Sequence, residues 1–371
     1  MGVDRLRMST YDRVAGLRLE IESYELAGLQ RDVSSDFTRR TTIVSLHGAG
    51  ETGVGEDVTY DGDEQERQQR RGAVHDLKGH HTIDSFSELL GSLDLFPGGD
   101  PGAATWLPHR LWAFESAALD LALRQSGDTF AAVLGREPRP VSFVVSMRIG
   151  EPPRIDRLLG LLERYPGTRF KLDPTSGWDE ALVSELARLG VVDTVDLKGA
   201  YRGTVVDQPA DAALYRLVAE GLPGAWIEDP DLSTPEAAEV LEPHRDRITW
   251  DAIIHSVSDI EALPFRPRTL NFKPSRFGTL RALFDAYDHC ERHEIAVYGG
   301  GQFELGPGRG QIQYLASLLH PDGPNDVAPS GFNDPLPGPG LPSSPLAPTP
   351  SETGFRWASD GLPPGAAGRT V

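Results

Sequence analysis

Three acidic residues stand where β-rich runs of the sequence end. Asp196 closes the run VVDTVDL, Glu228 lies in AWIED, and Asp251 lies in ITWDAII. In parallel-stranded barrels the carboxyl ends of the strands meet at one rim, so we expect these side chains to converge. Converging carboxylates repel one another and lose hydration, and a hard dication with oxygen ligands removes that cost. The residues therefore predict a site for Mg²⁺, or for Mn²⁺, with Asp196, Glu228 and Asp251 as ligands.

Lysine is rare in this chain and falls at the same places. Of the 36 lysine and arginine residues only four are lysines, namely Lys78, Lys171, Lys198 and Lys273. A buried amine can lose its proton near neutral pH, whereas a guanidinium cannot. The last three lysines end predicted strands, so we expect them to perform chemistry that arginine cannot.

The elements that would position these residues alternate from about residue 140 onward. Amphipathic helices such as IDRLLGLLERY separate β-rich runs at 142–147, 169–173, 191–197, 225–229, 248–254, 269–273 and 295–300. This spacing is typical of βα units in a parallel sheet. Seven units, with an eighth strand expected near DVAPSGF (326–332), predict a closed (β/α)₈ barrel. Asp173, Gln302 and Glu304 also fall at strand ends and are expected at the same rim.

The segment before the barrel predicts a separate α+β region. Residues 15–60 are expected to form strands, and 83–134 helices. The polar stretch 61–82 predicts a solvated loop or helix, and His75, His80 and His81 are interpreted as loop residues because no ligand lies at zinc-like spacing. Loops near 29–40 and 57–82 are expected to close the barrel mouth and set specificity.

The segment after the barrel is rich in proline. Residues 335–351 predict an extended wrap over the surface, with a disordered tail as the alternative, and FRW (355–357) is the expected docking point. The predicted domains are therefore 1–135, an N-terminal α+β capping domain, 136–334, the barrel with the metal site, and 335–371, a Pro-rich C-terminal segment.

Composition excludes several classes of partner. The formal net charge of −19 argues against nucleic acid, because phosphates would be repelled and no basic stripe compensates. No apolar run approaches the roughly 18 residues of a membrane helix, and no signal peptide is apparent, so a cytoplasmic location is expected. Cys290, the single cysteine, is interpreted as a small apolar core residue. Homo-oligomerisation is left open.

The strand-end motifs, taken in order, resemble the mandelate racemase/muconate-lactonising branch of the enolase superfamily. That branch carries K-x-K, D-x-N, E-x-P and D-E at the ends of the second to fifth strands, and some subgroups add a lysine on the sixth. The matching segments here are KLD (171–173), VDLKGAY (195–201), WIEDP (226–230), WDA (250–252), NFKPSRFG (271–278) and GGGQFELGPGR (299–309). GVGED (53–57) is similar to part of the family's capping domain, and the resemblance covers about residues 15–332.

The resemblance implies a reaction on a small-molecule carboxylate. Mg²⁺ would bind the substrate carboxylate, a base would remove the α-proton, and the cation would stabilise the enediolate. Lys273 is the expected principal base or acid, and Lys171 would orient the carboxylate or share the proton transfer. The outcome would be that of a racemase or epimerase, a dehydratase or a cycloisomerase, which makes the chain an isomerase or lyase.

Two positions depart from the family pattern. Asp173 replaces the second lysine of K-x-K, and Lys198 replaces the asparagine of D-x-N. Lys198 would restore an amine from the neighbouring strand, or Asp173 would itself accept the proton. Two other functions are carried as alternatives: a Schiff-base lyase with Lys273 or Lys198 as nucleophile, and a non-catalytic metal-binding barrel.

Overall fold

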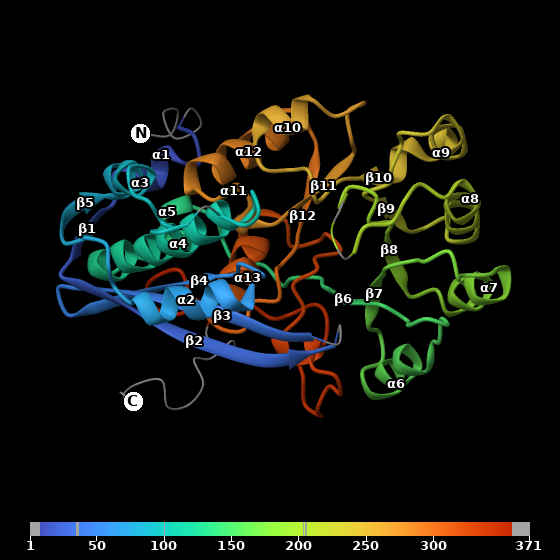
Figure 1. The fold of residues 1–371 in the computed structure, drawn as a ribbon, viewed down its shortest axis with the longest axis horizontal. Coiled ribbons are helices and arrows are strands. Elements are labelled where there is room, and N and C mark those ends of the chain that lie inside the picture. Colours follow the sequence, from blue (N-terminus) through green and yellow to red (C-terminus); the bar gives the residue numbers. More distant parts are fainter. Residues whose placement is uncertain (1–7, 35–36, 100, 203, 205, 358–371) are drawn as a thin grey trace.

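An antiparallel sheet with its helices forms the amino-terminal part of the chain (Figure 1). The computed structural model describes residues 8–34, 37–99, 101–202, 204 and 206–357. β2 (Ser23–Val33), β3 (Phe37–Gly48) and β4 (Glu51–Asp57) pair in sequence order, and β1 (Arg18–Ile21) pairs with β5 (Gly79–Thr82). The helices of this part are α1 (Asp12–Ala15), α2 (Gly62–Arg71), α3 (Ile83–Gly91), α4 (Trp106–Ser126) and α5 (Phe130–Leu134).

These elements confirm the strands expected over 15–60 and the helices expected within 83–134. The interpretation of His80 and His81 as loop residues was wrong. Both lie in β5, where they pair with Glu20 and Leu19 of β1. Two neighbouring residues of a strand point to opposite faces, so the side chains of His80 and His81 do not face one another.

Two glycines let α4 lie directly on β4. A Cβ atom at Gly53 would lie 2.2 Å from the carbonyl oxygen of Ala117, and one at Gly55 would lie 2.0 Å from that of Ala113. The GVGED sequence therefore provides a strand without side chains on the face that meets the helix. The contact fixes the position of Glu56 and Asp57, which follow directly.

A parallel barrel forms the second part of the chain. Its strands are β6 (Val144–Met147), β7 (Arg169–Leu172), β8 (Val192–Asp196), β9 (Trp226–Glu228), β10 (Ile248–Thr249), β11 (Thr269–Phe272) and β12 (Ala296–Gly299). β6 to β10 pair in sequence order, as do β11 and β12. Asn271 N donates to Trp250 O at 3.0 Å, which joins β11 to the end of β10. Parallel bridges from Asn325 to Phe143 and from Asp326 to Gly300 close the ring.

The helices of the barrel follow its strands, as expected. They are α6 (Asp156–Arg164), α7 (Glu180–Leu189), α8 (Ala212–Gly221), α9 (Pro235–Leu241), α10 (Val257–Glu261), α11 (Pro274–Phe277), α12 (Leu280–Arg292) and α13 (Pro307–Leu319), with 3₁₀ turns at Glu242–Arg247 and Ser330–Asn333. Figure 1 shows α6 to α9 along the outside of the sheet from β6 to β10. The (β/α)-barrel with an N-terminal capping region is thus confirmed, and no helix among the described residues is both long and apolar enough to cross a membrane.

Two expected strands are shorter than predicted. The eighth strand, expected over 326–332, is reduced to the bridges at Asn325 and Asp326, and Pro329 then precedes a 3₁₀ turn. The run 248–254 forms a strand only at Ile248–Thr249. Its next amides, Asp251 N and Ala252 N, donate to the carboxylate of Asp229 at 2.9 Å each, so they are unavailable to a strand ladder.

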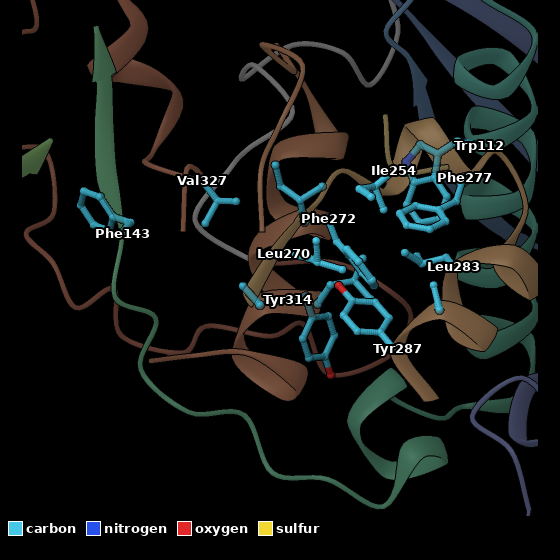
Figure 2. Close-up of a cluster of buried hydrophobic side chains, with 14 of the residues drawn as sticks. Trp112, Phe143, Ile254, Leu270, Phe272, Phe277, Leu283, Tyr287, Tyr314 and Val327 are labelled. Atoms are coloured by element: carbon cyan, nitrogen blue, oxygen red, sulfur yellow. The ribbon is translucent and has the colours of Figure 1, made fainter. Parts of the chain in front are cut away.

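An apolar cluster joins the barrel to the amino-terminal part. Phe272 of β11 packs between Phe277 and Tyr287, with ring centroids 4.9 and 5.0 Å away. Figure 2 shows these rings together with Trp112 of α4, which belongs to the same buried cluster. The apolar core therefore continues across the junction and holds the two parts in register.

Buried carboxylates secure the same junction. Glu56, at the end of β4, accepts hydrogen bonds from Leu305 N, Gly306 N and Gly308 N at 2.6, 3.0 and 3.0 Å. These amides lie at the amino terminus of α13, where a negative charge is stabilised by the helix dipole. Burial nevertheless raises the pKa of Glu56.

The Pro-rich segment wraps back onto α4, as predicted. Asp120 of α4 accepts a hydrogen bond from Phe355 N at 2.8 Å and pairs with Arg356 at 2.7 Å. Phe355 and Trp357 are buried, which confirms FRW as a docking point. The described part of the tail is therefore a strap across both parts.

Replacement of Gly55 by alanine tests the contact between β4 and α4. Because the new Cβ would collide with the α4 backbone, we expect Gly55→Ala to lower the free energy of unfolding by about 1–3 kcal/mol or more in chemical denaturation. Gly160→Ala is the matched control, since nothing lies within 4 Å of a Cβ there in α6. It should be neutral or stabilising by up to about 1 kcal/mol. Equal stability of Gly55→Ala and the wild type would contradict the packing argument.

Candidate active site

Asp196, Glu228 and Asp251 meet at the carboxyl ends of three neighbouring strands. Asp196 pairs with Glu228 across β8 and β9, and Asp251 follows the end of β10 by two residues. One carboxylate oxygen of each lies within 4.8 Å of those of the other two, and all three residues are completely buried. Among the described residues this is the one group of three or more acidic, histidine or cysteine side chains with such geometry. The set offers only hard oxygen donors, which fits Mg²⁺ or Mn²⁺ better than a thiolate-preferring metal.

The three strand-end lysines surround this triad. Lys171 Nζ lies 3.0 Å from Asp196 Oδ2 and also contacts Glu228 Oε1. Lys198 Nζ lies 2.5 Å from Asp196 Oδ2, and Lys273 Nζ lies 2.7 Å from Asp251 Oδ2. The folded chain thus brings together the three candidate metal ligands and the three lysines that the sequence predicted at this rim.

Asp173 lies beside Lys198 at the edge of the triad. Its Oδ2 accepts a hydrogen bond from Arg148 Nε at 3.1 Å, and its Oδ1 lies 3.6 Å from Lys198 Nζ. Oδ1 is buried and has no hydrogen-bond partner. Burial raises the pKa of Asp173 although Lys198 opposes this shift.

Four further polar side chains hold the triad and were not assigned from the sequence. Tyr298 OH donates to Glu228 Oε2 at 2.5 Å, and Asn271 Nδ2 lies 3.3 Å from both oxygens of Glu228. Arg276 Nη1 lies 2.7 Å from Asp251 Oδ1, and its Nη2 donates to Tyr201 OH at 2.9 Å. Asn271 was detectable, because it stands two residues before Lys273 on one strand face. Tyr298 reaches the triad only because the barrel closes, which no local pattern reveals. Arg276 follows Lys273 by three residues and contacts Asp251 at the end of the neighbouring strand.

Burial and neighbouring charges shift the pKa values of the rim residues in different directions. Burial would lower the pKa of Lys171, but Asp196 and Glu228 outweigh it and the pKa is raised well above its usual value. For Asp196 and Asp251 burial is outweighed by the neighbouring cations, so both carboxyl groups have lowered pKa values. Burial raises the pKa of Glu228, and raises that of neighbouring Asp229 to about 6. Burial thus disfavours the charged form of several acidic groups at this rim, and an added cation would offset that cost.

The amino-terminal part covers this rim. Tyr60 OH donates to Gln302 Oε1 at 3.0 Å, and Arg39 Nη2 donates to Gln302 O at 3.0 Å. Gln302 and Glu304 are buried beneath this contact, as members of the rim after β12. Glu304 pairs with Arg309 at 3.1 Å.

The expectation of a covering loop over 29–40 was wrong in its secondary structure. Residues 29–33 and 37–40 belong to the paired strands β2 and β3, and residues 35–36 lie outside the described residues. Their alternating polar residues had obscured a long hairpin. Its end rests on the barrel, because Ser34 N donates to Asn333 O at 2.7 Å and Arg31 pairs with Asp334 at 2.8 Å.

Models of one protein family match both parts of the chain. The C-terminal domain of DUF8230, described as a domain of unknown function, matches residues 137–334, and the corresponding N-terminal domain matches 12–133. The chain is also 32% identical to an N-succinylamino acid racemase from Amycolatopsis sp over 295 residues, which are 76% of each protein.

Solved structures share the fold. A muconate lactonizing enzyme from Pseudomonas putida aligns with a TM-score of 0.63 at 17% identity, covering 91% of this chain and 96% of that one. A dipeptide epimerase from Methylococcus capsulatus, complexed with Mg ion, aligns with a TM-score of 0.58 at 19% identity, covering 85% and 88%. Together with the acidic triad, these findings support a divalent metal centre.

Replacement of Glu228 by glutamine tests the triad as a metal site. Glutamine keeps the shape of the side chain but removes the charge, so we expect calorimetry to show Mn²⁺ or Mg²⁺ affinity weakened at least ~10-fold. Glu115→Gln is the matched control, because Glu115 is a buried carboxyl group of α4 outside the triad. Unchanged affinity in Glu228→Gln would remove the metal assignment.

Proposed function

The chain belongs to the DUF8230 family and to the enolase superfamily, in its mandelate racemase/muconate-lactonising branch, and we propose that it removes and returns the α-proton of a small-molecule carboxylate. We favour racemisation or epimerisation over dehydration and cycloisomerisation. The observation that carries this choice is the position of lysines on both sides of one carboxylate triad.

The two lysines approach from opposite walls of the barrel. β7, which carries Lys171, is the second barrel strand, and β11, which precedes Lys273, is the sixth. In a closed ring of eight strands the second and sixth face each other across the axis. A planar carbon held between them would be accessible to one amine on each face, as inversion of a stereocentre requires.

The triad fits the divalent cation that this family implies. Asp196, Glu228 and Asp251 would hold Mg²⁺, with Mn²⁺ as a substitute, because their donors are all oxygen and lie close together. When bound, the cation would supply Lewis-acid stabilisation of the negative charge that develops as the α-proton leaves. Tyr298, Asn271 and Arg276 fix the orientation of two of the ligands and so preorganise the site.

Lys273 is the proposed principal proton-transfer residue, and Lys171 its counterpart on the other face. In the arrangement described, acidic neighbours hold the pKa of Lys273 above its usual value despite burial. A divalent cation bound at the triad would lower the pKa of the neighbouring Lys273 amine and so move that pKa toward the range useful for a base. Electrostatic stabilisation must supply most of the acceleration, since an α-proton of a carboxylate is very weakly acidic.

Substrate recognition is assigned to the cap. Tyr60 and Arg39 lie over Gln302 at the rim, and the β2–β3 hairpin rests beside Asn333. These contacts place the capping part where it would exclude water and contact the distal end of a substrate. The similarity to an N-succinylamino acid racemase makes N-succinylated amino acids the first substrates to examine.

The Schiff-base alternative is less well supported. A Schiff-base lyase with Lys273 or Lys198 as nucleophile gives no role to the buried triad of Asp196, Glu228 and Asp251, whereas proton transfer beside a divalent cation uses it. Among the residues that the structure describes, no feature favours the non-catalytic alternative over the enzyme.

Replacement of Lys273 by arginine tests the proton-transfer role. Arginine retains the charge that pairs with Asp251 but does not release its proton near pH 7. We expect Lys273→Arg to lose α-hydrogen exchange at least ~10²-fold, measured by proton NMR of N-succinylated amino acids in D₂O. Its Mn²⁺ affinity should stay within a few-fold of wild type.

The control is Lys78→Arg, because Lys78 is exposed in the loop before β5 and outside the rim. It should exchange at the wild-type rate. If Lys273→Arg exchanges normally while Lys171→Arg does not, the principal role belongs to Lys171. Normal exchange by both variants would contradict lysine acid–base chemistry altogether.

A further inference from the structure

We propose that Lys198 and Asp173 form a charge-exchange pair, in which the Lys198 ammonium moves from Asp196 to Asp173 when a divalent cation binds the triad. The inference rests on the proposed metal centre and concerns how these side chains admit the ion. Both are positioning residues in this scheme, and Lys198 stays protonated throughout.

Asp196 Oδ2 is already crowded by positive charge. Lys198 Nζ lies 2.5 Å from this oxygen and Lys171 Nζ lies 3.0 Å from it. A dication at the triad would face two ammonium groups at contact distance, and like charges in a buried site repel strongly. At least one of the two must withdraw for the oxygen to become a metal ligand.

Lys171 is poorly placed to withdraw. Its ammonium bridges Asp196 and Glu228, so it stays bonded to one ligand when it leaves the other. The side chain is 1% exposed and extends from within a central strand. Lys198, by contrast, follows β8 and is 12% exposed.

An acceptor for the Lys198 ammonium lies next to it. Asp173 Oδ1 is buried, has no hydrogen-bond partner and is 3.6 Å from Lys198 Nζ. A buried acceptor without a hydrogen-bond partner is destabilising, and more so when it is charged, so we expect the ammonium 3.6 Å away to satisfy it in another state. Arg148 holds the other oxygen at 3.1 Å and keeps the carboxylate facing Lys198.

Hydrogen bonds hold the backbone around Lys198, and its ammonium lies within 4 Å of both carboxylates. Lys198 has a φ of +57°, its N–H donates to Asp196 Oδ1 at 3.2 Å, and its carbonyl accepts from Tyr201 N at 3.2 Å. A left-handed conformation is costly for a residue with a Cβ and persists where the surroundings enforce it. The side chain can therefore change partner by rotating its own bonds, with no movement of the strand.

Crystal structures of the wild-type protein grown with and without Mn²⁺ test the exchange directly. With Mn²⁺ at the triad we expect Lys198 Nζ within hydrogen-bond distance of Asp173 Oδ1 and out of contact with Asp196 Oδ2. Without Mn²⁺ it should contact Asp196. An ammonium that still contacts Asp196 in the Mn²⁺-bound crystal would overturn the proposal while leaving the metal centre intact.

Mn²⁺ affinity, measured by calorimetry, gives a second readout. Lys198→Met removes the competing ammonium and should tighten Mn²⁺ binding at least ~10-fold. Asp173→Asn removes the receiving charge and should weaken binding at least ~3-fold. Two variants serve as controls that change charge by the same amount. Lys78→Met lies on an exposed loop of the cap, and Asp193→Asn lies on β8, where Asp193 pairs with Arg169. Each control should change Mn²⁺ affinity less than ~2-fold.

Unchanged or weaker binding by Lys198→Met would refute the exchange even if Asp173→Asn behaved as expected. A wild-type protein that shows no saturable Mn²⁺ binding would instead refute the metal centre, and the exchange with it. The crystal comparison uses only the wild-type chain, so the proposal stays testable if either variant fails to fold.

Discussion

The burial of three carboxylates at one rim is the constraint on which the rest of the site depends. The side chains of Asp196, Glu228 and Asp251 are completely buried, and one carboxylate oxygen of each lies within 4.8 Å of those of the other two. Such a group is stable only if cations and hydrogen-bond donors surround it. Three lysines, an arginine, an amide and two phenols perform this function, and they come from β7, β11 and β12 and from the segments that follow β8 and β11. The site therefore contains many polar residues because the charges of the three buried carboxylates must be compensated.

The cap is held over this rim by the same principle. Glu56 is buried against the amino terminus of α13, and Asp120 is buried against the C-terminal strap. Glu56 has its partners only when the cap meets the barrel, and Asp120 has Phe355 and Arg356 only when the tail meets the cap. The glycines of β4 place Glu56 at the right depth, because they let α4 approach the strand backbone. The covering of the site is consequently built from the same buried charges that stabilise the fold.

Most barrel strands could be predicted from the sequence because their signal is local. A buried parallel strand such as RFKL carries its apolar run and its functional end residue in one short segment. Features that depend on closure could not be predicted. The early end of β10 follows from Asp229 on the preceding strand, and Tyr298 meets Glu228 from the far side of the ring. Strands were expected over 15–60, but the end of the β2–β3 hairpin near 29–40 was expected as a loop, because its polar alternation suits both an exposed loop and a half-buried strand.

Asp173 and Lys198 appear in the sequence as two separate departures from the family pattern, yet they act on one charge balance. The family pattern places a lysine and a neutral asparagine at these positions, whereas this chain places an aspartate and a lysine there. The number of positive charges at these two positions is therefore unchanged, but one negative charge is added. The added negative charge favours a bound dication and disfavours a second anionic group of the substrate near β7 and β8. The Lys198 ammonium lies between Asp196 and Asp173, so it can pair with either carboxylate without changing the total charge of the rim. The two replacements are thus best understood as a single change in how the rim accommodates a cation.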